Sequence, residues 1–188
     1  MRYLIVCGGK IDKEFGLNEI KTDGIDAIIA ADSGMDFLYE NGVTPDIIVG
    51  DFDSATTKAL EFFERKGQTE IHRLNPIKDD TDTEYAIRLA IREGARSIVM
   101  LGATGSRIDH VLGNISLLGI GLESGTDISI IDTNNRIRMA DKPVTIEKSA
   151  QYGRFVSLIA VTDDNEVSLR GFKYPVTDYS FDRFTSLG

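Results

Sequence analysis

Two patterns of hydrophobic and polar residues follow each other along the chain. Up to residue 132, short runs rich in β-branched residues alternate with stretches whose apolar positions recur at helical spacing. The runs show little polar alternation, which is typical of strands in a parallel sheet that helices cover on both faces. We therefore expect strands at 3–7, 27–31, 46–49, 70–73, 97–101 and 127–131.

Amphipathic helices are predicted between these strands. In the last of them, Val111, Ile115 and Leu118 lie on one apolar face. Glycine follows the first three at the position where helices usually end. The predicted helices cover residues 35–41, 55–66, 83–93 and 110–123. This alternation predicts an α/β fold, a mostly parallel sheet flanked by helices.

The pattern changes after Asp132, where shorter strand-like runs follow one another. Asn134-Asn135 and Lys142-Pro143 are typical turn sequences. Candidate strands lie at 136–139, 144–147, 155–160, 166–170 and 172–174. We therefore expect residues 1–132 to form the α/β domain and residues 133–188 a small antiparallel β-domain.

Composition and charge exclude several classes of protein. Of the 188 residues, 41% are hydrophobic and 27% charged, which suits a chain with a buried core. The net charge of −9 argues against nucleic acid as a partner, because nucleic-acid-binding faces are basic. No apolar run approaches the roughly 20 residues that cross a bilayer. The single cysteine, Cys7, cannot form an internal disulfide. We expect a cytoplasmic protein that binds neither membrane nor nucleic acid.

Aspartates directly follow two of the predicted strands. Asp32 follows the run at 27–31, and Asp51 and Asp53 follow the run at 46–49. Ligands of open parallel sheets bind beyond the carboxyl ends of the strands, so these carboxylates should meet at one edge. An Asp-x-Asp pair can share a hard cation through oxygen ligands. Alternatively, Asp53 or Ser54 only caps the next helix, and the sequence leaves both interpretations open.

A second acidic cluster, residues 78–84, precedes another predicted helix. Its carboxylates repel one another unless a cation or the helix N-terminus offsets their charge. Alternatively, Asp80 or Thr81 caps the helix and Glu84 closes a capping box.

A third candidate is the loop at 102–110, between a predicted strand and a helix. Gly102 and Gly105 would let backbone amides approach an anion, and Arg107 would add a forked contact to phosphate. The chain lacks the P-loop and dinucleotide-binding fingerprints. Two histidines are too few for a multi-histidine metal site. What remains is an oxygen-ligated metal beside phosphate, the set of groups used in phosphoryl transfer.

Four motifs in this order resemble those of the thiamine pyrophosphokinase (thiamin diphosphokinase) family. They are Asp32-Ser33-Gly34, PDIIVGDFDS at 45–54, KDDTDTE at 78–84 and GATGSRIDH at 102–110, with Leu112-Gly113-Asn114 following. The resemblance implies Mg²⁺-dependent transfer of the β,γ-diphosphate of ATP to the hydroxyl of thiamine, giving thiamine diphosphate and AMP. It also implies a homodimer whose C-terminal domain is a thiamine-binding β-sandwich.

The resemblance also implies the roles of individual residues. Asp32, Asp51, Asp53 and Asp82 would hold Mg²⁺ and the polyphosphate. Asp51, Asp53, Asp82, Arg107 and Asp109 are the expected catalytic residues, with Asp53 and Asp109 as candidate general bases. The expected ATP-binding and substrate-binding residues are Ser54, Thr81, Gly102, Thr104, Gly105, Arg107 and Asn114.

The end of the sequence departs from the family pattern. Relatives continue past a stretch like residues 185–188 with a Ser-Asn pair and a final strand, a segment that helps to form the thiamine pocket. We expect either that the protein is shortened or that the sequence omits this tail. Two other functions stay open. A metal-dependent phosphohydrolase would use the same carboxylates, and a nucleotide- or thiamine-binding module would have lost catalysis.

Overall fold

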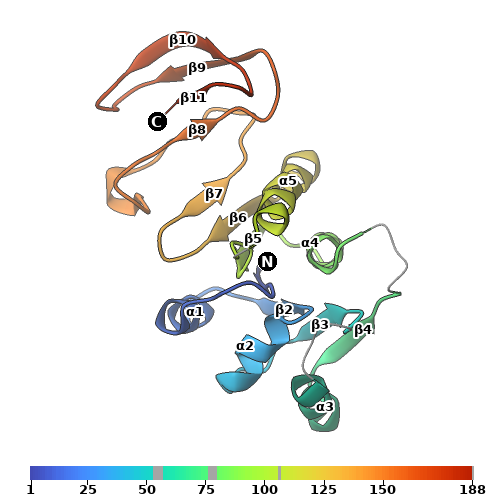
Figure 1. Cartoon of the computed structure of the whole chain (residues 1–188). Coiled ribbons are helices and arrows are strands. Elements are labelled where there is room, and N and C mark those ends of the chain that lie inside the picture. The colour runs from blue at the N-terminus through green and yellow to red at the C-terminus, as the bar shows by residue number, and fades with distance from the viewer. Residues whose placement is uncertain (53–56, 76–79, 106, 188) are drawn as a thin grey trace. The chain divides into compact units, whose positions relative to one another are not determined.

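The computed structural model describes residues 1–52, 57–75, 80–105 and 107–187, and it divides into two compact units, Met1–Thr145 and Ile146–Gly188 (Figure 1). The first unit alternates strands and helices. Its elements are β1 (Arg2–Val6), α1 (Lys13–Ile20), β2 (Ala27–Ala31), α2 (Gly34–Glu40), β3 (Ile47–Gly50), α3 (Thr57–Lys66), β4 (Glu70–Arg73), α4 (Asp82–Arg92), β5 (Ser97–Leu101), α5 (Ile108–Ser124), β6 (Asp127–Ile131) and β7 (Arg136–Arg138).

The strands of the first unit form one seven-stranded sheet in the order β4-β3-β2-β1-β5-β6-β7. Neighbours from β4 to β6 are parallel, and β7 returns antiparallel along β6. The chain moves outward from β1 to β4 and then crosses to the other side of β1, where it continues with β5. The strand order therefore reverses between β1 and β5, the position at which open α/β sheets bind ligands.

Two apolar layers hold helices against the two faces of this sheet. Tyr3 and Ile5 of β1 pack with Ile87 of α4 and Leu118 of α5. The alternate residues of β1, Leu4 and Val6, belong to a second layer with α2 and α3, in which Leu38 and Phe63 are fully buried. Because successive side chains of a strand point to opposite faces, one short apolar run supplies both layers.

These elements confirm the predicted mostly parallel sheet flanked by helices. The strands β2, β4, β5 and β6 have the predicted bounds. Helix α1 was not predicted. Gly16 is the one buried residue of α1, so the apolar periodicity of this helix is weak in the sequence. Gly16 packs so closely that a Cβ would lie 2.7 Å from the ring of Phe37.

The second unit contains the 3₁₀ helix η1 (Lys148–Ala150) and two antiparallel strand pairs. Strand β9 (Asn165–Leu169) pairs with β10 (Val176–Phe181), and β8 (Leu158–Ile159) pairs with β11 (Ser186–Leu187). The expected antiparallel character is confirmed. The strands predicted at 144–147 and 172–174 are wrong, since these residues lie outside any strand.

Strand β7 belongs to the first unit, because Ile137 pairs with Ile130 of β6. The first compact unit accordingly extends to Thr145, beyond the change of pattern at residue 132. Among the described residues, no helix has the length and apolar character needed to cross a membrane.

Candidate active site

Three aspartates meet where β2 and β3 end and α4 begins. Asp32 follows β2, Asp51 follows β3 and Asp82 is the first residue of α4. One carboxylate oxygen from each lies within 4.8 Å of the other two, and all three residues are partly buried. The expected convergence at one sheet edge therefore occurs for Asp32, Asp51 and Asp82. Asp53 and Ser54, predicted beside them, lie outside the described residues.

The turn after β2 fixes the position of Asp32. The backbone of Asp32 is left-handed, with φ of 48°, a conformation that Asp tolerates better than most residues. Its amide donates to the carbonyl of Val49 at 2.8 Å, which ties the end of β2 to β3. Gly34 continues the turn against β1, where a Cβ would lie 1.9 Å from the carbonyl oxygen of Val6. Oδ1 of Asp32 is consequently buried from solvent.

Thr81 caps the N-terminus of α4. The carboxylate of Asp82 does not cap the helix and lies with those of Asp32 and Asp51. The hydroxyl of Thr81 accepts a hydrogen bond from the amide of Glu84 at 3.1 Å. The carboxylate of Glu84 instead pairs with Arg88 at 2.7 Å, one turn further along the helix. The capping interpretation therefore describes Thr81. The helix dipole also favours the negative charge of Asp82 in the first turn.

These three carboxylates fit a magnesium ion. Mg²⁺ takes oxygen ligands at about 2.1 Å, so oxygens that share one ion lie up to about 4 Å apart. Carboxylate oxygens within 4.8 Å of one another reach that spacing through small side-chain rotations. Like charges this close repel, and a cation between them removes the repulsion.

The glycine-containing loops after β1 and β5 lie at the point where the strand order reverses. The amide of Gly9, after β1, donates to the carbonyl of Gly102, after β5, at 2.9 Å. A Cβ at position 9 would lie 2.3 Å from that oxygen, and Gly102 has a left-handed φ of 68°. Glycine at both positions therefore allows the two loops to touch through their backbones.

Arg107 and Asp109 form an exposed ion pair at the start of α5. Arg107 Nη2 lies 2.6 Å from Asp109 Oδ2, and the two side chains are 69% and 65% exposed. The hydrogen bond from Arg107 lowers the pKa of the Asp109 carboxyl. Asp109 is thereby a weaker proton acceptor than an ordinary aspartate.

Two other predicted binding residues contact the protein itself. Asn114 Nδ2 donates to the carbonyl of Ala103 at 2.9 Å, and Thr104 Oγ1 donates to Asp132 Oδ2 at 2.7 Å. Sequence reasoning treated Asp132 only as the end of a domain. Asp132 follows β6 in the same way as Asp32 follows β2. This position after a strand could have identified Asp132 as a candidate residue from the sequence.

Cys7 is a core residue, as its apolar surroundings in the sequence indicate. The side chain is buried, and burial raises the pKa of its thiol to about 12. The hydroxyl of Thr83 donates to its sulfur at 3.8 Å.

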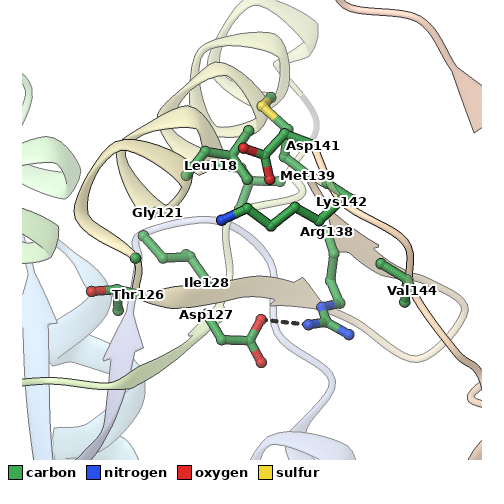
Figure 2. A pocket seen from close by; sticks show the side chains of 13 residues that line it. Leu118, Gly121, Thr126, Asp127, Ile128, Arg138, Met139, Asp141, Lys142 and Val144 are labelled. Atoms are coloured by element: carbon green, nitrogen blue, oxygen red, sulfur yellow. Dashed lines mark hydrogen bonds and ion pairs between the residues drawn. The ribbon is translucent and has the colours of Figure 1, made fainter.

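A surface hollow of about 220 Å³ lies at the other end of the sheet, between the end of α5, the start of β6 and residues 138–144 (Figure 2). Asp127 and Arg138 in its wall form an ion pair at 2.7 Å, so their charges offset each other. Leu118, Ile128 and Val144 supply apolar wall. Because the carboxylates gather at the opposite end of the strands, we place the candidate active site there.

Comparison with known proteins agrees with the fold. The family profile described as "Thiamin pyrophosphokinase, catalytic domain" matches residues 21–130, and the profile "Thiamin pyrophosphokinase, vitamin B1 binding domain" matches residues 143–188. Thiamine pyrophosphokinase of Bacillus subtilis (strain 168) is 36% identical over 152 residues, which cover 80% of this chain and 70% of the relative.

Solved structures of such proteins resemble the whole chain. The crystal structure of thiamine pyrophosphokinase from Bacillus subtilis superposes with a TM-score of 0.83 at 29% identity, covering 98% of this chain and 86% of the other. The enzyme from Geobacillus thermodenitrificans superposes with a TM-score of 0.81 at 28% identity, covering 99% and 87%.

Proposed function

The chain belongs to the thiamine pyrophosphokinase family, and on that premise we propose that Asp32, Asp51 and Asp82 form its Mg²⁺ and polyphosphate site. As a thiamine diphosphokinase, the protein transfers a diphosphate group from ATP to thiamine, giving thiamine diphosphate and AMP. The convergence of three carboxylates from separate elements is the observation that carries the site assignment.

The reaction needs a polyanion held still while one bond forms and another breaks. The hydroxyl oxygen of thiamine bonds to the β-phosphorus, and the bond from that phosphorus to the α,β-bridging oxygen breaks to release AMP. The hydroxyl proton passes from the attacking oxygen to a base, for which Asp53 is the candidate. A Mg²⁺ ion held by the three carboxylates would neutralise phosphate charge and polarise the phosphorus–oxygen bonds. The protein's own part is to orient the reacting groups and to place charge where it develops.

The residues divide this work by their positions. Asp32, Asp51 and Asp82 would hold the cation at the ends of β2 and β3 and the start of α4. Backbone amides of the loop at residues 102–105 would approach the anion, and Arg107 would contribute a planar cation. Asp53 lies outside the described residues and stays a predicted metal ligand and candidate base. Asp109 is disfavoured as the base, because Arg107 lowers its pKa.

We assign thiamine binding and dimer formation to the second unit. The profile named for vitamin B1 binding matches it. Phe155, Ile159 and Phe184 are 82%, 77% and 90% exposed, and large exposed apolar side chains favour a protein interface. Light scattering should report a homodimer, and Phe155→Ser with Phe184→Ser should shift it toward monomer. A monomeric parent chain would contradict the dimer.

A cytoplasmic location stays a prediction that rests on the single, buried cysteine.

Separation of the nucleotide products tests the reaction. The protein is incubated with ATP and Mg²⁺, with and without thiamine. Thiamine-dependent AMP is expected. ADP as the product would contradict the assignment, and phosphate release at a similar rate without thiamine would favour a phosphohydrolase. Tight binding by calorimetry without turnover would identify a binding module.

A further inference from the structure

We propose that Asp132 is a positioning residue that braces the loop at residues 102–105 through the hydroxyl of Thr104. The proposal rests on the proposed function, in which this loop faces the polyphosphate. Asp132 would act from the end of β6 without touching either substrate.

The carboxylate of Asp132 serves two segments at once. Its Oδ1 accepts from the amides of Asn134 at 2.7 Å and Asn135 at 2.8 Å, which closes the turn between β6 and β7. Its Oδ2 accepts from Thr104 Oγ1 at 2.7 Å. Asn135 Nδ2 lies 3.0 Å from both oxygens. One carboxylate therefore joins the turn to the loop.

The charge of Asp132 is suited to this role. Burial raises the pKa of its carboxyl, but the hydrogen bonds from Asn135, Asn134 and Thr104 outweigh burial and lower the pKa overall. Hydrogen bonds to an ionised acceptor are shorter and stronger than neutral ones. The brace is thus ionic in character and complete at neutral pH.

The loop needs such support because it has little regular structure of its own. Ala103 is buried, and its carbonyl accepts from Asn114 Nδ2 of α5 at 2.9 Å. Gly102 contacts the backbone of Gly9 on the other side. The bond from Thr104 to Asp132 adds a third anchor, from β6. Removing one anchor would shift backbone amides relative to phosphate and so weaken the binding of ATP.

Two variants isolate the bond. Thr104→Val keeps the shape of the side chain and removes the hydroxyl. Asp132→Asn retains an oxygen for the turn amides but presents an amide nitrogen to Thr104 and Asn135. Asp127→Asn is the control, because Asp127 lies on the same strand at its other end and pairs with Arg138. Thr104→Ser tests rescue by a hydroxyl.

We expect Thr104→Val and Asp132→Asn each to raise KM for ATP by about tenfold, the scale for losing an outer-shell partner. The effect on kcat should be smaller, and KM for thiamine should change less than twofold. The double variant should be no worse than Asp132→Asn alone, since both substitutions disrupt the bond between Thr104 and Asp132. Thr104→Ser should recover most of the affinity lost in Thr104→Val, and Asp127→Asn should behave as the parent protein.

Two measurements need no turnover. Calorimetry with a non-hydrolysable ATP analogue and Mg²⁺ should show the same loss of affinity, and amide exchange at residues 102–105 should accelerate in both variants. Unchanged analogue affinity with unchanged exchange in a folded Thr104→Val protein would overturn the brace. So would effects of the two substitutions that multiply in the double variant. If the parent chain binds the analogue yet makes no AMP, the proposed function fails while these measurements still test the brace.

Discussion

Aspartates flank the strands at both ends of the sheet, but they do different things at the two ends. At the amino end, Asp26 and Asp46 precede β2 and β3, and each accepts a hydrogen bond of 2.7 Å from a backbone amide of the neighbouring strand. At the carboxyl end, Asp32, Asp51 and Asp82 bring carboxylates within 4.8 Å of one another. The carboxylates at the amino end accept hydrogen bonds from backbone amides and so extend the hydrogen bonding between strands. The carboxylates at the carboxyl end lie close to one another, an arrangement suited to binding a cation.

The difference teaches that position beside a strand does not by itself identify a ligand. Asp46 and Asp51 bound the same strand, and both look like strand-end aspartates in the sequence. The amide of Asp46 also donates back to the carbonyl of Ile28, so this residue completes a parallel ladder. The strongest test of this difference is therefore to make the same substitution at both ends of a strand and to compare the effects on activity and stability.

Asp51→Asn should have the largest effect. Removal of one ligand charge should lower the rate of AMP formation by about a thousandfold, the scale for losing a group that stabilises charge in the transition state. The melting temperature should stay the same or rise, because repulsion within the cluster decreases. Asp46→Asn is the matched control on β3 and should keep activity within about twofold. Loss of activity in both variants would contradict the division between the two ends.

Arg107→Lys should have the next largest effect, lowering kcat/KM for ATP by about tenfold or more. An ammonium carries the charge but cannot reproduce the planar fork of a guanidinium. Arg138→Lys is the control at the amino end, where the arginine pairs with Asp127. Steady-state kinetics with ATP as the varied substrate distinguishes them, and equal kinetics for Arg107→Lys and the parent would contradict a forked phosphate contact.

Asp46→Ala should affect stability and leave catalysis intact. The substitution removes the acceptor of the Ile28 amide, which should lower the free energy of unfolding by about 1 kcal/mol. Urea denaturation followed by circular dichroism measures the change. A drop in AMP formation with no change in unfolding free energy would show that Asp46 belongs to the site after all.

The smallest predicted effect is a shift in titration. Arg107 lowers the pKa of the Asp109 carboxyl, so Arg107→Gln should raise that pKa toward the ordinary aspartate value, and carboxyl NMR measures it. By linkage, the pair contributes stability above the ordinary pKa and loses it as pH falls through the lowered value. An unchanged titration in Arg107→Gln would mean that another group holds the pKa down.

The parallel sheet was predictable because its strands are continuous apolar runs, and the run at 97–101 corresponds residue for residue to β5. The meeting of Asp32 and Asp51 was predictable from strand direction alone. Asp82 comes from a helix, and its assignment needed the family resemblance.

The second unit was harder to predict because its strands are short and their periodicity is mixed. Strand β10 carries an irregular register between Val176 and Tyr179, which breaks the alternation that a sequence pattern relies on. Asp132 was missed for another reason. Its partner Thr104 lies 28 residues earlier, and only the order of strands β5 and β6 brings the two together.

The backbone contact between Gly9 and Gly102 has a genetic consequence. At both positions even alanine is too large, because a single methyl group would meet a carbonyl oxygen at 2.3–2.4 Å. Neither glycine has a side chain to offer to chemistry, yet both should be intolerant of every substitution in a saturation screen. Alleles at these codons would imitate active-site defects, because a side chain at either position would push apart the loops that follow β1 and β5, beside the proposed polyphosphate site.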